Sequence, residues 1–127
     1  MEGKKMGIGE RIKQIREAFD LTQEEFGARL GYGRAHISML EGGERIPTER
    51  AIVDICRIFG ISREWLLEGK GDMRGDEQNF IAAVVDSMGI MDPEEREFLI
   101  SYFRLPEEHR KAFVRFLDRL LEQQKKK

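Results

Sequence analysis

The stretch TQEEFGARLGYGRAHISMLEGG, residues 22–43, has the pattern of two short helices joined by a tight turn. Thr22 is placed to cap the first helix, and Glu25, three residues later, completes a capping box. Gly27 leaves room where the two helices cross, and Gly31 supplies the positive-φ residue that ends the first helix. This layout is typical of a helix-turn-helix.

The second helix of the pair has an inward and an outward face. Ile37 and Leu40 fall on the inward face at helical spacing. The outward side of such a second helix is the part that enters the major groove of DNA in helix-turn-helix proteins. The residues predicted on that outward side are Arg34, Ala35, Ser38 and Met39.

These residues resemble the Cro-like XRE family of helix-turn-helix DNA-binding domains, which includes phage repressors. In this motif the resemblance lies in Thr22-Gln23-Glu24-Glu25, Gly27, Gly31, Ile37-Ser38, Leu40-Glu41 and Gly43. It continues through Pro47, an apolar run from Ile52 to Ser62, and the ending Trp65-Leu66-Leu67-Glu68-Gly69. It covers residues 8–70 and implies a five-helix, repressor-like domain.

The resemblance also implies roles for individual residues. Gln23 is expected to contact a backbone phosphate and to brace the second helix, while Arg34 is expected to bind guanine O6 and N7. Arg16 and Glu41 correspond to an ion pair that ties the first helix of the domain to the second motif helix. The residues expected to contact DNA are Gln23, Gly33, Arg34, Ala35, Ser38, Met39, Arg45 and Thr48.

Three positions in this region leave alternatives open. Gly33 stands where the family commonly has serine or threonine, so a side-chain contact to phosphate is missing there. Tyr32 either donates its hydroxyl to a phosphate or packs on the domain surface. His36 lies between the two faces of its helix, and a partly buried structural histidine is the expected role rather than a pH switch or a base contact.

Composition narrows the class of protein. The 127 residues carry a net charge of −2, and residues 1–70 hold 12 Lys and Arg against 12 Asp and Glu. Such a balance predicts modest DNA affinity for one subunit, and we expect dimerisation to supply much of the affinity of the complex. No apolar stretch approaches the roughly 20 residues that a membrane span needs. Cys56 is the single cysteine, so we expect no intrachain disulfide and a cytoplasmic location.

The sequence offers no catalytic or cofactor site. The two histidines, His36 and His109, have no cysteine or carboxylate partners at metal spacing. Gly31-Tyr32-Gly33 lacks the preceding strand and the third glycine of a nucleotide-binding fingerprint. We therefore expect no enzyme, no metal, no cofactor and no small-molecule ligand.

The C-terminal part is predicted to be a separate helical module. A glycine-rich linker is expected at 71–76, followed by an oligomerisation region at 77–127 with helices near 77–88, 93–103 and 106–123. Its apolar stripe is too large for so short a segment to bury alone, which favours a homodimer, although folding back onto the first domain is the alternative. The residues predicted to form the dimer contact are Phe98, Tyr102, Phe113, Phe116, Leu117 and Leu120.

Together these features predict an all-α regulator of transcription. Residues 1–70 would bind double-stranded operator DNA, and a phage or mobile-element repressor that acts as a dimer on an inverted repeat is the leading hypothesis. One alternative is an antitoxin-like autoregulator that holds a protein partner through its C-terminal helices. Another is a protein-interaction adaptor whose helix-turn-helix has lost DNA binding.

Overall fold

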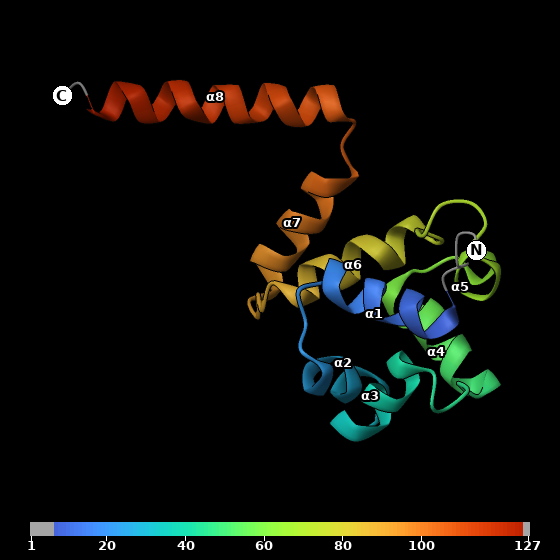
Figure 1. Ribbon diagram of the computed structural model, residues 1–127. Coiled ribbons are helices and arrows are strands. Elements are labelled where there is room, and N and C mark those ends of the chain that lie inside the picture. The colour runs from blue at the N-terminus through green and yellow to red at the C-terminus, as the bar shows by residue number, and fades with distance from the viewer. Residues whose placement is uncertain (1–6, 126–127) are drawn as a thin grey trace. The chain divides into compact units, whose positions relative to one another are not determined.

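The computed structural model describes residues 7–125, and the ends of the predicted ranges at 1–6 and 126–127 lie outside them. The secondary-structure elements of residues 7–125 are all helices, apart from one isolated β-bridge. Figure 1 shows the helices in chain order. They are α1 (Ile8–Ala18), α2 (Gln23–Leu30), α3 (Arg34–Gly42), α4 (Glu49–Phe59), α5 (Arg63–Glu68), α6 (Glu77–Ser87), α7 (Pro93–Arg104) and α8 (Glu107–Lys125). The prediction of an all-α fold is confirmed.

The predicted start and stop signals of the motif helices are present. The Thr22 hydroxyl accepts a hydrogen bond from the Glu25 backbone N–H at 3.0 Å, and the Glu25 carboxylate accepts one from the Thr22 N–H at 2.8 Å. Gly31 ends α2 in the left-handed region with φ of 83°, and Gly43 ends α3 with φ of 82°. An L side chain adopts these angles only at a cost, so glycine fixes both helix ends.

The core of the first unit lies among α1 to α5, and aromatic rings pack against one another within it. Phe59 of α4 packs against Phe26 of α2 and Phe19 after α1, with ring centroids 4.9 and 5.1 Å apart. Ile12, Ile15, Ile37 and Ile55 are among the aliphatic residues that fill the space around these rings, all fully buried. The amphipathic spacing predicted for α1, α3 and α4 is therefore matched by burial of their apolar faces.

The division of the chain differs from the predicted one. The first compact unit continues to Gly89 and includes α6, so it ends well beyond the predicted boundary at residue 70. Residues 71–76 do not separate the units, because Arg74 forms a β-bridge with Ile61 and the Gly75 N–H donates to the Gly60 carbonyl at 2.7 Å. Of the predicted oligomerisation region, only the part after Gly89 forms a separate unit.

Helix α6 belongs to the first unit because its apolar side chains complete that core. The Phe80 ring lies 5.4 Å from the Phe19 ring, and Ala83 is buried with the core residues. Gly60 permits this approach, since a Cβ at that position would overlap the backbone of Phe80. The predicted apolar pattern of residues 77–88 was thus correctly identified as a helix but assigned to the wrong unit.

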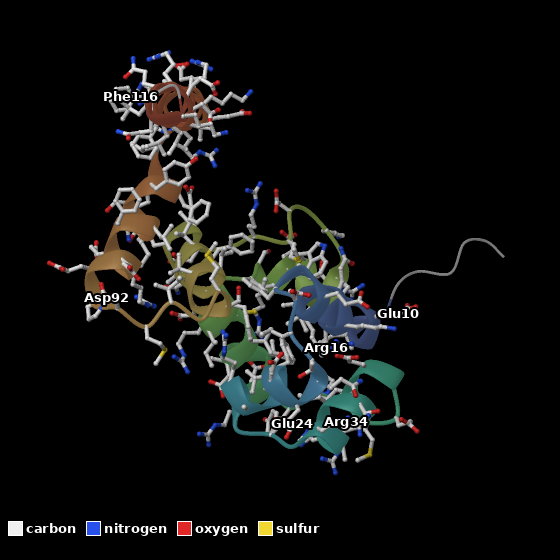
Figure 2. All side chains as sticks on the ribbon, turned by 90° about the vertical axis from the view of Figure 1, so that its left-hand side faces the viewer. Glu10, Arg16, Glu24, Arg34, Asp92 and Phe116 are labelled. Carbon is white, nitrogen blue, oxygen red and sulfur yellow. The ribbon has the colours of Figure 1, made fainter. Side chains whose placement is uncertain are left out.

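The second unit, Ile90–Lys127, consists of α7 and α8 in its described part. Phe113 of α8 packs against Phe98 and Tyr102 of α7, with ring centroids 6.2 and 5.8 Å apart. No residue of the 19-residue α8 is buried, and Figure 2 shows Phe116 projecting from this helix. The unit therefore carries a long helix whose apolar stripe has little cover from within this unit.

Candidate nucleic-acid interface

The angle between α2 and α3 is set by a close backbone approach at Gly27. A Cβ on Gly27 would overlap the carbonyl oxygen of Tyr32 in the turn, and it would press on the Ile37 side chain. The Tyr32 N–H donates to the Gly27 carbonyl at 2.8 Å, which closes the turn. The role predicted for Gly27 is confirmed, and the contact it permits is with the turn as well as with α3.

The outward side of α3 is open to solvent. Ile37 and Leu40 are buried beneath α3. Figure 2 shows Arg34 on the side of α3 away from α1. The predicted outward residues Arg34, Ala35, Ser38 and Met39 are all exposed. The structure thus brings them together on one surface, whose contact with DNA stays a prediction.

Arg34 differs in its surroundings from the arginines of α4. Arg50 and Arg57 both lie near Asp54, at 3.9 and 3.3 Å from its carboxylate oxygens. Arg34 forms no ion pair with any residue between 7 and 125. Its guanidinium at the first turn of α3 is therefore available to an external acceptor such as guanine or phosphate.

A hydrogen-bonded network holds α3 in place. Arg16 of α1 donates to both carboxylate oxygens of Glu41, from Nε at 2.6 Å and from Nη2 at 3.1 Å. The Arg16 Nη1 also donates to the Leu21 carbonyl at 2.9 Å, and the hydrogen bond with Glu41 raises the pKa of Arg16. Gln23 Nε2 of α2 donates to the same carboxylate at 3.1 Å. Three helices thus meet at Glu41, which fixes the last turn of α3.

A second polar group lies at the outer edge of α3. The Tyr32 and His36 rings are stacked with centroids 4.1 Å apart, and Arg45 Nη1 lies 3.3 Å from His36 Nδ1. Burial and the charge of Arg45 lower the pKa of His36. Tyr32 therefore packs on the domain surface, while the alternative contact of its hydroxyl with a phosphate stays a prediction. His36 is half-buried as expected.

Comparisons with known proteins agree with this geometry. Residues 12–66 match the protein family described as helix-turn-helix. An uncharacterized HTH-type transcriptional regulator from Archaeoglobus fulgidus is 39% identical over 54 residues, which is 42% of this chain and 76% of that protein. The chain belongs to the Cro-like XRE family of helix-turn-helix transcriptional regulators.

Two further relatives extend the comparison. The HTH-type transcriptional regulator DicA of Escherichia coli is 29% identical over 107 residues, covering 84% of this chain and 75% of DicA. The antitoxin PezA of Streptococcus pneumoniae is 38% identical over 55 residues, covering 43% of this chain and 35% of PezA. No solved structure was found to match the chain. The match to DicA therefore reaches beyond the family domain into the second unit.

Within the family pattern, Gly33 and Thr48 occupy helix caps. Gly33 is the N-cap of α3 in extended conformation and provides no side-chain hydrogen bond, as expected from its departure from serine or threonine. The Thr48 hydroxyl accepts from the Ala51 N–H at 3.1 Å, so it caps α4. The predicted phosphate contact of Thr48 would therefore have to use its hydroxyl hydrogen or its backbone N–H.

Two residues that hold α1 against its neighbouring helices in this XRE domain were not predicted from the sequence. Arg11 is buried. It donates from Nε to the Leu66 carbonyl at 2.7 Å and from Nη2 to the Leu67 carbonyl at 3.0 Å. These bonds give partners to carbonyl groups at the C-terminal end of α5, which have none within the helix. Gly9 lets α1 approach α3, because a Cβ there would lie 2.5 Å from the Leu40 carbonyl oxygen. A signal for Arg11 was its spacing, three residues after Ile8 on the apolar face of α1.

Between residues 7 and 125, no three His, Cys, Asp or Glu side chains are grouped so that they could hold a metal ion. No helix in the same range is long and apolar enough to cross a membrane.

Proposed function

We propose that this XRE-family regulator binds a specific operator in double-stranded DNA through the outward side of α3. The observation that carries the proposal is the guanidinium of Arg34, which has no ion-pair partner among residues 7–125, on a helix that is braced from α1 and α2. A guanidinium held at the first turn of a recognition helix is suited to bidentate hydrogen bonding with guanine. Ala35 and Met39 would contact thymine methyl groups, and Ser38 a base edge or phosphate.

Dimerisation is the second part of the proposal. The first unit, residues 1–89, carries 13 Lys and Arg against 16 Asp and Glu, which is a net charge of −3. Its overall charge therefore adds little to phosphate binding, so two linked units would bind far better than one. The exposed apolar side chains of α7 and α8 offer the contact, with Phe98 at 56% and Phe116 at 49% exposure. The remaining members of the proposed contact are Tyr102, Phe113, Leu117 and Leu120.

The proposed mechanism is steric. A dimer would place its two α3 helices in successive major grooves about 34 Å apart and would contact a near-palindrome. Bound at a promoter, it would exclude polymerase, and repression is the role that the resemblance to a family containing phage repressors implies. A regulator acts where the DNA is, so the cytoplasmic location follows from the same proposal. Phage or mobile-element origin is part of this proposal.

The match to the antitoxin PezA favours one second candidate. In this version the first unit still binds DNA, while α7 and α8 hold a protein partner in place of a second copy. Loss of DNA binding in Arg34→Ala does not separate the two versions, because the first unit binds DNA in both. Light scattering of the purified chain does, since a self-associating protein has at least twice the monomer mass without any partner.

The DNA proposal is tested by an arginine comparison. Binding of the chain to its enriched duplex is measured by fluorescence anisotropy for Arg34→Ala and for Arg57→Ala, a control that removes an arginine paired with Asp54. Arg34→Ala should lose about 1–3 kcal/mol of discrimination at one base pair of each half-site. Equal losses for the two variants would contradict base contact by Arg34.

A further inference from the structure

Arg45 contacts His36 over the face of the imidazole ring. Arg45 Nη1 lies at almost the same distance from both ring nitrogens of His36, 3.3 Å from Nδ1 and 3.4 Å from Nε2. If Nη1 lay in the plane of the imidazole ring at equal distances from Nδ1 and Nε2, it would overlap Cε1, the ring carbon between the two nitrogens. The guanidinium nitrogen therefore lies over the face of the ring, where arginine stacks on aromatic groups.

The other stacking contact of His36 is the ring of Tyr32. Their centroids are 4.1 Å apart and their planes are inclined by 27°. Tyr32 comes from the turn between α2 and α3, His36 from α3, and Arg45 from the loop after α3. The stack therefore couples the two loops that flank α3, across the edge of that helix.

The stack also explains how a loop arginine is held without an acidic partner. Arg45 is exposed and forms no ion pair with another residue in the described range. A long exposed side chain in a loop otherwise loses considerable rotamer freedom on binding. An aromatic surface that holds it before binding reduces that loss, while the recorded contact with His36 engages Nη1 alone among its nitrogens.

We propose that His36 and Tyr32 are positioning residues that hold Arg45 ready to contact a DNA phosphate beside the recognition helix. This inference rests on the proposed DNA-binding function and adds to it how the loop contact is preorganised. A neutral ring suits this role, because an imidazolium would repel the guanidinium. Burial of His36 and the charge of Arg45 both lower the pKa of His36, which favours its neutral form.

The test is a double-mutant cycle on the full chain. The probe is the duplex that wild type enriches from a random pool, with anisotropy measured over a series of salt concentrations. Arg45→Ala should weaken binding and reduce the salt slope by about 1, as for a lost phosphate contact. His36→Ala should weaken binding about two- to fivefold, the value of a cation–aromatic contact. His36→Phe, which keeps a flat ring, should restore most of that loss.

The proposal is decided by whether the effects of His36→Ala and Arg45→Ala on DNA affinity depend on each other. In the Arg45→Ala background, His36→Ala should change affinity no further, and the control His109→Ala on α8 should have no effect in either background. If the effects of His36→Ala and Arg45→Ala multiply, the positioning role is wrong although the protein binds DNA. If wild type binds no duplex at low salt, the proposed function fails and this inference fails with it.

Discussion

Substitution of Glu41 by glutamine should loosen the recognition helix by a predictable amount. The Glu41 side chain is 5% exposed and that of its partner Arg16 is 14% exposed, so the pair is largely removed from water. Breaking a buried pair leaves the remaining charge desolvated, and removal of one partner typically costs about 3–5 kcal/mol. Because Arg16 keeps the Leu21 carbonyl as an acceptor, we expect a loss of about 2–3 kcal/mol.

The assay follows Trp65, the sole tryptophan, which is buried in α5 of the first unit. With a urea m-value of about 2 kcal/mol/M, the unfolding midpoint of Glu41→Gln should fall by about 1–1.5 M. Glu49→Gln is the matched control, because its pair with Arg63 lies at the surface with side chains 67% and 49% exposed. Its midpoint should stay close to that of wild type. Equal midpoints for Glu41→Gln and Glu49→Gln would refute the bracing role of the network.

Three other predictions test separate parts of the structure. Gly60→Ala should lower the urea midpoint more than Gly71→Ala, since both positions have positive φ but only Gly60 lies against the backbone of α6; equal shifts would contradict the assignment of α6 to the first unit. The pKa of His36, followed by NMR, should lie below 6.5 and rise in Arg45→Ala, because a nearby cation is removed; an unchanged pKa would exclude the contact in solution. Phe116→Asp should leave Trp65 emission unchanged and halve the mass found by light scattering, whereas an unchanged mass would refute dimerisation through α8.

Local signals allowed most of the helices to be predicted from the sequence. Caps such as Thr22 and positive-φ glycines such as Gly31 act over three or four residues, so the sequence determines them directly. The ion pair between Arg16 and Glu41 was expected only because the chain resembles a known family. The exposed residues of α3 followed from the spacing of Ile37 and Leu40.

Long-range packing was the part that sequence reasoning could not supply. The glycine-rich segment before α6 has the composition of a linker, but Gly75 is needed there for close contact with the Ile61 backbone. Composition cannot distinguish a flexible glycine from one required by a close approach. The burial of Arg11 was also not predicted, because a charged residue on an apolar face is ordinarily expected to reach solvent.

The central claim is tested most directly by selection of duplexes from a random DNA pool. The full chain, Arg34→Ala and Phe116→Asp are each used for selection at low salt, and the bound duplexes are sequenced. The account predicts an inverted repeat for wild type, the loss of one defined base preference per half-site for Arg34→Ala, and single half-sites for Phe116→Asp. Recovery of no enriched sequence with the wild-type chain would contradict the claim that this protein binds specific DNA.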